Sequence, residues 1–275
     1  MSIKTLFFIL LFILNLSANE RIISLSPSIT EIIYALGKGE ELVATSTYSL
    51  YPKEATKLPV IGGYEKPHLE KILSFKPTLV IGQNFNTGTL KKLKLFHIKT
   101  ISLNLQTLNN IKTSINKISI YLDTQKEGKK LVSNINNALK NCTKNKKPHS
   151  VMIVYGLKED IKSDVYIAGH NIFFEDIILA CGNTNAYTSK STNQPVLNYE
   201  NILLLNPEQI IILHSHATEP NVDVKKALKN WYSLPVFAAK HGNISVVDED
   251  YLHIPSHRVA KTIKRLFDEM SLYHD

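Results

Sequence analysis

Residues 69–81 read LEKILSFKPTLVI, and residues 199–211 read YENILLLNPEQII. Aligned without gaps, the two stretches are identical at five places: Glu70/Glu200, Ile72/Ile202, Leu73/Leu203, Pro77/Pro207 and Ile81/Ile211. Self-similarity at a fixed spacing is typical of an internal repeat. The chain is therefore predicted to consist of two related halves.

A second repeated pair lies upstream of the first in each half. Residues 31–37, EIIYALG, resemble residues 176–182, DIILACG. Apolar side chains in both recur at helical spacing, and the final Gly can adopt the left-handed conformation that closes a helix. Each half thus has the same predicted order: a helix closed by Gly, an irregular stretch, a short helix, a Pro and an apolar strand.

Strands are predicted at the start of each half and after each repeated Pro. The apolar runs are 21–25, 78–81, 150–155 and 209–213. Helices that alternate with such strands favour parallel sheets flanked by helices. We therefore predict an α/β fold with two pseudo-repeated lobes, each built on a central, mostly parallel sheet.

A long helical pattern separates the two halves. Thr124 and Glu127 have the spacing of a capping box, and Leu131, Val132, Ile135 and Leu139 follow at helical spacing. A rigid helix is therefore expected to bridge the lobes and to limit their hinge motion. The predicted domains are a signal peptide at 1–18, an N-terminal lobe at 19–122, a linking helix at 123–147 and a C-terminal lobe at 148–275.

Composition narrows the functional class. The 275 residues are 44% hydrophobic and carry a net charge of +8, but Lys and Arg are spread along the whole chain. A nucleic-acid-binding protein more often gathers its basic residues on one element, so no nucleic-acid partner is expected. The two cysteines, Cys142 and Cys181, could form a bridge in an oxidising compartment, although the sequence does not show that they meet.

The first twenty residues have the pattern of a secretory signal peptide. Lys4 precedes the apolar run 6–14, and Ser17 and Ala18 are small residues before an expected cut after Ala18. The alternative is a membrane anchor, but a spanning helix needs about 20 apolar residues and this run is shorter. We therefore expect a soluble exported protein.

Polar and aromatic side chains follow the predicted strands of both halves. Ligand sites in α/β proteins lie at the carboxyl ends of strands and between domains, so a ligand is expected in a cleft between the lobes. The candidates are Tyr48, Tyr51, Tyr64, Gln83, Tyr155, His170, Gln194, His214, His216, Tyr251 and His253. Their chemistry suits a large, flat, amphipathic ligand, because aromatic side chains supply contact area at low entropic cost.

The order of these segments resembles the periplasmic substrate-binding proteins that have a helical spacer. The resemblance rests on residues 21–37, 58–81 and 198–213, and on a closing region with Trp231, Leu234, Pro235 and Arg258. It implies a monomeric binding protein of the periplasm, not an enzyme. This protein would deliver cobalamin, haem or a ferric siderophore to an importer with a dimeric permease and an ATPase. The ligand would contain cobalt or iron, with no covalently bound cofactor and no metal site of the protein's own.

The resemblance also implies roles for individual residues. Glu70 and Glu200, one in each half, match the pair that docks onto arginines of the two permease subunits. Tyr51, Tyr64 and Tyr155 match aromatic positions against the corrin in cobalamin-binding members, whereas Gln83 and Gln194 replace two further aromatics. Arg258 joins the ligand-binding set.

Two features depart from a simple cobalamin-binding pattern. The family's disulfide partner for Cys181, expected in the closing helix, is missing. Haem-binding members ligate iron through a Tyr in the loop that here carries Tyr64, so haem stays open as the ligand.

Two other functional classes remain to be weighed. His214-x-His216 follows a predicted strand and, with Asp248 and Asp250, could hold the metal of an exported hydrolase. A lone H-x-H is a weak pattern, and the chain has neither H-E-x-x-H, nor G-x-S-x-G, nor a P-loop. A cell-surface interaction module without a small ligand is the third alternative.

Overall fold

The computed structural model describes residues 20–142, 147–162, 164–191, 194–215, 219 and 221–275. The predicted signal peptide and its cut after Ala18 therefore lie outside the described residues. Contacts divide the chain into two compact units. Unit 1 contains residues up to 27 together with 38–102, and unit 2 contains 28–37 together with 103–275. The lobe and linker boundaries expected from chain order stay a prediction.

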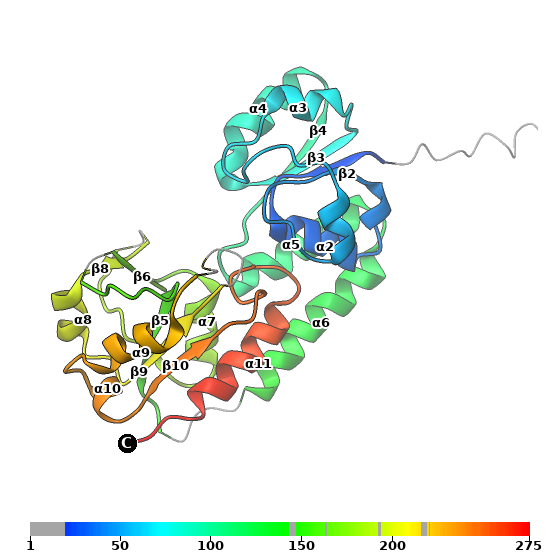
Figure 1. Cartoon of the computed structure of the whole chain (residues 1–275). Coiled ribbons are helices and arrows are strands. Elements are labelled where there is room, and N and C mark those ends of the chain that lie inside the picture. Colours follow the sequence, from blue (N-terminus) through cyan, green and yellow to red (C-terminus); the bar gives the residue numbers. More distant parts are fainter. Residues whose placement is uncertain (1–19, 143–146, 163, 192–193, 216–218, 220) are drawn as a thin grey trace, which may run out of the picture. The chain divides into compact units, whose positions relative to one another are not determined.

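Unit 1 is built on a four-stranded sheet with the order β2-β1-β3-β4 (Figure 1). Its strands are β1 (Ile22–Ser24), β2 (Leu42–Ala44), β3 (Leu79–Gln83) and β4 (Lys99–Leu103). β1 pairs in parallel with both β2 and β3, and Ile23 lies opposite Val80. The α-helices are α3 (Leu69–Ser74) and α4 (Thr87–Leu95), with short 3-10 turns at Gly39–Glu41, Lys53–Lys57 and Asn84–Asn86.

Unit 2 contains a six-stranded sheet with the order β10-β9-β5-β6-β8, in which β7 also pairs with β5. Its strands are β5 (Ser150–Tyr155), β6 (Val165–Ile167), β7 (Thr184–Asn185), β8 (Val196–Leu197), β9 (Gln209–Leu213) and β10 (Ile244–Val247). β5, β9 and β10 are parallel, whereas β6 is antiparallel to β5 and β8. The α/β class with mostly parallel sheets is confirmed.

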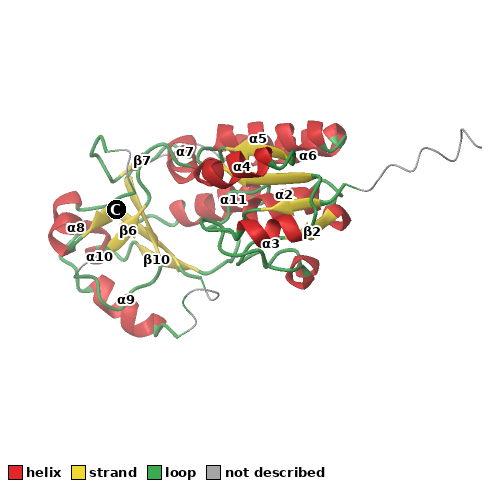
Figure 2. Ribbon diagram, turned by 90° about the horizontal axis from the view of Figure 1, so that it is seen from above, coloured by secondary structure: helices red, strands yellow, loops and turns green. Residues whose placement is uncertain are grey.

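Figure 2 shows all helices of the chain in red, including those of unit 2. They are α2 (Pro27–Ala35), α5 (Leu108–Tyr121), α6 (Gln125–Asn141), α7 (Phe173–Ala180), α8 (Tyr199–Leu205), α9 (Val224–Tyr232), α10 (Phe237–Lys240) and α11 (Val259–Met270). α6 falls within the expected spacer and packs against α5 and α11. Thr124 does not cap it as predicted, because the Thr124 hydroxyl donates to the Ser119 carbonyl instead.

The internal repeat is visible in both halves of the chain. Gly37 and Gly182 follow α2 and α7 with φ of 78° and 82°, as expected for residues that close helices. α3 and α8 end shortly before Pro77 and Pro207, and β3 and β9 then begin. Lys76 and Asn206 also share a left-handed conformation, with φ of 47° and 42°. The predicted order of helix, Pro and strand is therefore confirmed in each half.

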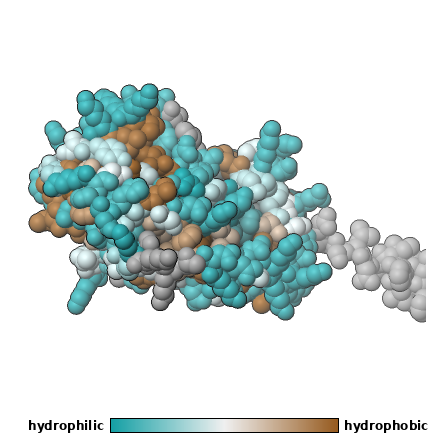
Figure 3. All heavy atoms as spheres, turned by 90° about the horizontal axis from the view of Figure 1, so that it is seen from below, coloured by the Kyte–Doolittle hydropathy of each residue, from teal (hydrophilic) through white to brown (hydrophobic). Residues whose placement is uncertain are grey.

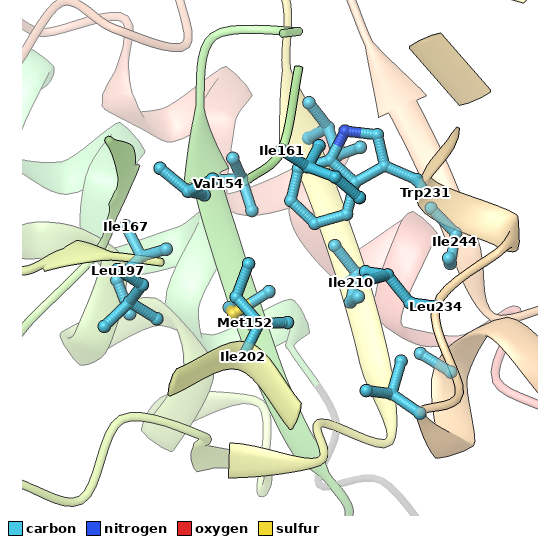
Figure 4. Close-up of a cluster of buried hydrophobic side chains, with 14 of the residues drawn as sticks. Met152, Val154, Ile161, Ile167, Leu197, Ile202, Ile210, Trp231, Leu234 and Ile244 are labelled. Atoms are coloured by element: carbon cyan, nitrogen blue, oxygen red, sulfur yellow. The ribbon is translucent and has the colours of Figure 1, made fainter. Parts of the chain in front are cut away.

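Each unit has its own hydrophobic core. Ile23, Ile72 and Val80 are fully buried in unit 1 and pack in one cluster. In unit 2 the residues between the sheet and its helices include Met152, Ile210 and Trp231 (Figure 4). Trp231 is fully buried, and its indole lies beside Ile161 and the strand that carries Ile210.

One disulfide joins two helix ends of unit 2. Cys142 follows α6, Cys181 follows α7, and their Cα atoms are 5.2 Å apart. The bridge that the sequence left open is therefore present. Cys181 pairs with the end of α6, not with the closing helix in which the resemblance expected its partner.

Candidate functional site

Large apolar side chains remain exposed beyond the strand ends of unit 1. Tyr48, Leu50 and Tyr51 follow β2 and are 56%, 56% and 43% exposed. Tyr64 and Phe85, in two further loops, are 40% and 53% exposed. Figure 3 shows one face of the molecule, on which hydrophobic residues form patches among hydrophilic ones. Aromatic side chains that stay exposed in one region are typical of a ligand-binding surface.

Tyr64 and Phe85 form a pair supported by a buried amide. Their ring centroids are 5.9 Å apart at an interplanar angle of 75°, an edge-to-face arrangement. Asn86 is 2% exposed, and its Nδ2 donates to the Tyr64 carbonyl at 2.7 Å. Its Oδ1 accepts from the backbone N–H of Gln83 at 2.9 Å. Two predicted site residues are thus linked by a residue that the sequence analysis did not select.

The phenol of Tyr64 is held in its neutral form. Burial raises its pKa, and the adjacent Glu65 carboxylate raises it further through repulsion and a hydrogen bond. In the absence of a cation nearby, this side chain therefore offers an aromatic face and a hydroxyl group, not a phenolate.

In unit 2, Tyr155 at the end of β5 lies in an aromatic group. Its ring meets Phe174 edge-to-face at 5.5 Å and lies 6.2 Å from the tilted ring of His253. Burial raises the pKa of Tyr155 and lowers that of His253, so both side chains are neutral at pH 7. Among the described residues, the buried Nε2 atom of His253 has no hydrogen-bond partner. Tyr155 and His253, both predicted site residues, are therefore neighbours.

His214 lies at the end of β9 and is 2% exposed. Its Nε2 contacts the Glu219 carbonyl at 3.2 Å. The Glu219 carboxylate accepts a hydrogen bond from the Leu157 N–H at 3.1 Å. A Cβ added to Gly156 would lie 2.3 Å from the other oxygen of this carboxylate. Gly156, at φ 83°, therefore makes room for this contact. His216 lies outside the described residues, so the predicted His214/His216 pair stays untested.

Arg258 is 8% exposed and binds a carboxylate within unit 2. Its Nε lies 2.8 Å from Glu31 Oε2, and its Nη2 contacts the other oxygen of the same carboxylate. The Ser256 hydroxyl donates to that carboxylate at 2.5 Å. The Arg258 guanidinium also lies over the Tyr251 ring, 5.7 Å from its centroid. Arg258 thus joins α2 to the start of α11.

His170 and Gln194 also contact protein groups. His170 Nδ1 contacts the Glu175 carboxylate, and the His170 ring lies 5.6 Å from Tyr187. Gln194 Nε2 donates to the Ile167 carbonyl at 2.6 Å. Both side chains are therefore anchored beside β6 and α7 of unit 2.

The two acidic residues expected to dock lie at equivalent places in the repeat. Glu70 is in the first turn of α3 and Glu200 in the first turn of α8, and both are exposed. A carboxylate there also complements the helix dipole, which is worth about 0.3–1 kcal/mol. Their exposure leaves both carboxylates available to a cationic partner.

Asn86 and Glu219 are the main residues that the sequence analysis missed. Asn86 follows the predicted strand by only a few residues, as other candidates do, so its position was a usable signal. Glu219 carries no such signal, because its contact with the end of β5 joins segments 62 residues apart.

The part of the chain that the structure describes holds no group of three or more His, Cys, Asp or Glu side chains that could bind a metal ion. Asp248 and Asp250 thus form no such group with His214 there. Nor does any described helix combine the length and apolar character needed to cross a membrane.

Known proteins similar to this chain are binding proteins. Residues 22–251 match the family model described as periplasmic binding protein. A vitamin B12-binding protein of Vibrio parahaemolyticus is 30% identical over 247 residues, covering 89% of this chain and 86% of the relative. One from Vibrio vulnificus is 28% identical over 274 residues, covering 96% and 95%.

Solved structures show the same fold. The periplasmic vitamin B12-binding protein of Vibrio cholerae has a TM-score of 0.77 and 25% identity, covering 92% of this chain and 97% of that protein. The periplasmic haem-binding protein of the same organism also has a TM-score of 0.77, with 22% identity, and covers 92% and 99%.

Proposed function

Because the chain belongs to the periplasmic binding protein family, we propose that it captures a cobalt- or iron-containing chelate and delivers it to an ATP-driven importer. The observation that carries the ligand class is the set of exposed aromatic side chains beyond the strand ends of unit 1, above all Tyr64 and Phe85. Such rings can cover the faces of a broad macrocycle. The ligand-binding roles of the twelve predicted residues are part of this proposal.

Cobalamin is the ligand that we propose first. Curated relatives that cover most of the chain are vitamin B12-binding proteins. The neutral Tyr64 phenol suits this ligand, because packing against a corrin needs an aromatic face and no phenolate. The resemblance places aromatic side chains at two positions that are Gln83 and Gln194 in this chain. Phe85, two residues after Gln83, would supply the ring surface that is missing at the first of these positions.

Haem is the second candidate, favoured by the exposed hydroxyl-bearing ring of Tyr64. A tyrosinate ligand to iron(III) would have to form against the raised pKa of this side chain. The charge of the metal itself can drive that ionisation. The two ligands thus demand different states of the same phenol.

A catalytic role is not part of this proposal. His214 is buried and contacts the Glu219 carbonyl, which does not suit the open coordination site that a metal-dependent hydrolase needs. We also propose that the chain is exported, acts as a monomer and docks through Glu70 and Glu200. The relatives' periplasmic location and the exposure of both carboxylates support this.

Absorption titrations test the ligand class directly. Purified protein is titrated with cyanocobalamin, haemin and ferric enterobactin, whose visible bands are distinct. We expect saturable binding of cyanocobalamin, and Tyr64→Ala should weaken it about tenfold through lost ring contact. A coordinated haem would instead show a tyrosinate-to-iron charge-transfer band that disappears in Tyr64→Ala.

Tyr121→Ala is the matched control, because Tyr121 is 42% exposed, close to the 40% of Tyr64, but lies at the end of α5. It should bind as the wild type does. If the wild type binds none of the three chelates, the proposed function is wrong.

A further inference from the structure

The loop that carries Tyr64 is closed tightly at its base. Gly62 pairs with Pro67 in an antiparallel bridge, and the His68 N–H donates to the Ile61 carbonyl at 2.9 Å. The Gly62 carbonyl accepts the Thr47 N–H at 3.0 Å. Tyr64 therefore lies in a short loop whose two ends are fixed by backbone hydrogen bonds.

The middle of this loop is held by Asn86. The Asn86 side chain donates to the Tyr64 carbonyl and accepts from Gln83 N–H, so it joins the loop to the end of β3. Gly82 leaves space for it, since a Cβ there would lie 3.0 Å from Asn86 Oδ1. A buried side chain with both polar groups bonded to backbone is a rigid support.

The same support places Phe85. Phe85 is in the 3-10 turn Asn84–Asn86, between Asn86 and Asn84, whose Oδ1 accepts from the Ser102 hydroxyl at 3.1 Å. Tyr64 and Phe85 belong to different loops, but they meet edge-to-face and both remain substantially exposed. The bond from Asn86 to the Tyr64 carbonyl and this ring contact both hold the middle of the loop against the turn.

We propose that Asn86 is a positioning residue, which aligns Tyr64 and Phe85 into one preformed aromatic surface for the chelate and thereby sets its affinity. This inference rests on the proposed function. Preorganisation raises affinity because the loops need not be ordered when the ligand binds. Asn86 itself is buried and does not contact the ligand.

Asn86→Asp separates the two hydrogen bonds of this residue. An aspartate can still accept from Gln83 N–H, but its ionised form has no proton to donate to the Tyr64 carbonyl. Binding is therefore measured over a series of pH values that extends to the pH at which this buried carboxyl is ionised. Loss of this one buried bond should weaken cyanocobalamin binding about tenfold.

Asn243→Asp is the matched control, because Asn243 is 5% exposed and also bonds backbone through both polar groups, but in unit 2. Its Nδ2 donates to the His274 carbonyl at 2.7 Å, and its Oδ1 accepts from the His274 N–H at 3.0 Å. This variant should bind as the wild type does.

Two further measurements separate positioning from general destabilisation. In the unliganded protein, hydrogen–deuterium exchange in residues 61–68 should rise in Asn86→Asp, with exchange in unit 2 unchanged. Exchange in residues 61–68 should not rise in Asn243→Asp. In a double-mutant cycle, Asn86→Asp should weaken cyanocobalamin binding less once Tyr64→Ala is present, because one of the two rings that Asn86 aligns is then gone. A role in stability alone would leave the affinity of the folded protein unchanged in Asn86→Asp.

The outcomes are distinguishable from failure of the proposed function. If the wild type binds cyanocobalamin and Asn86→Asp binds it equally well, or if the cycle is additive, the inference is wrong and the proposed function stands. If the wild type binds none of cyanocobalamin, haemin and ferric enterobactin, the proposed function is wrong, and the inference is overturned with it. If it binds haemin or ferric enterobactin but not cyanocobalamin, the same comparisons are made with the chelate that binds.

Discussion

At the scale of single residues, His257 makes the stability of unit 2 depend on pH. Its Nδ1 is buried without a hydrogen-bond partner among the described residues. Burial, with the nearby positive charges of Arg258 and Lys261, lowers its pKa from 6.5 to about 4. The folded protein therefore binds fewer protons than the unfolded chain between these values, and stability falls as pH drops below about 6.5.

The linkage predicts a loss of about 2 kcal/mol in unfolding free energy between pH 7 and pH 5 from this residue alone. In His257→Asn the slope of stability against pH should be reduced over that range, as measured by urea unfolding at a series of pH values. His97→Asn, at an exposed position with φ 59°, is the control and should retain the wild-type slope. An unchanged slope in His257→Asn would contradict the assignment.

The roles of single residues could be predicted only where they depend on the residue's neighbours in the sequence. Tyr48, Tyr51 and Tyr64 were selected because they follow predicted strands, and they are exposed there. The ligand-binding role of Arg258 stays a prediction, and its guanidinium also binds Glu31, a residue 227 positions away. A single sequence contains no signal for that pairing, because it depends on how α2 packs in unit 2.

At the scale of elements, the ion pair between Glu31 and Arg258 links α2 to the start of α11. Both groups are nearly inaccessible, at 3% and 8% exposure. Removing one partner leaves a buried charge uncompensated, so Glu31→Gln and Arg258→Met should each lower the free energy of unfolding by about 3–5 kcal/mol. The Glu31→Gln/Arg258→Met variant should lose less than the sum of the two, as measured by urea unfolding.

Lys38→Gln shows, for comparison, how much stability is lost when a partly exposed ion pair is removed. Lys38 bonds Glu41 at 2.6 Å with its side chain 31% exposed, so the loss should stay below about 1 kcal/mol. Additive losses for Glu31 and Arg258 would show that the two do not act as a pair. A large fall in ligand affinity without loss of stability in Arg258→Met would support its proposed role in ligand binding.

The elements themselves were largely predictable, because apolar periodicity and Pro or Gly breaks are local properties. β5 and β9 have the predicted bounds, and α3 and α8 stop before their prolines. The short β6 and β8 were not predicted, since strands of three and two residues contain too few residues to show alternation. The predicted capping box at Thr124 is wrong, because the Thr124 hydroxyl donates to the Ser119 carbonyl in α5 and does not cap α6.

At the scale of the whole molecule, the repeat places one exposed carboxylate on the first turn of a matching helix in each unit. Two equivalent charges suit a partner with two equivalent basic patches, since each contact raises the effective concentration of the other. Glu70→Ala combined with Glu200→Ala should therefore lower cobalamin uptake about tenfold or more, while the affinity of the purified protein for cyanocobalamin stays unchanged.

Uptake is measured with radiolabelled cobalamin in cells in which this chain is the sole binding protein for its importer. Glu54→Ala combined with Glu127→Ala is the matched control. It also removes two exposed carboxylates from first turns, one in each unit, but outside the repeat. An equal loss of uptake in both double variants would indicate an effect of net charge and not of docking. The chain is basic, and each double variant raises its net charge by the same amount. Wild-type uptake in the Glu70 and Glu200 variant would show that docking uses another surface, since removing both carboxylates leaves no two-point contact through this pair.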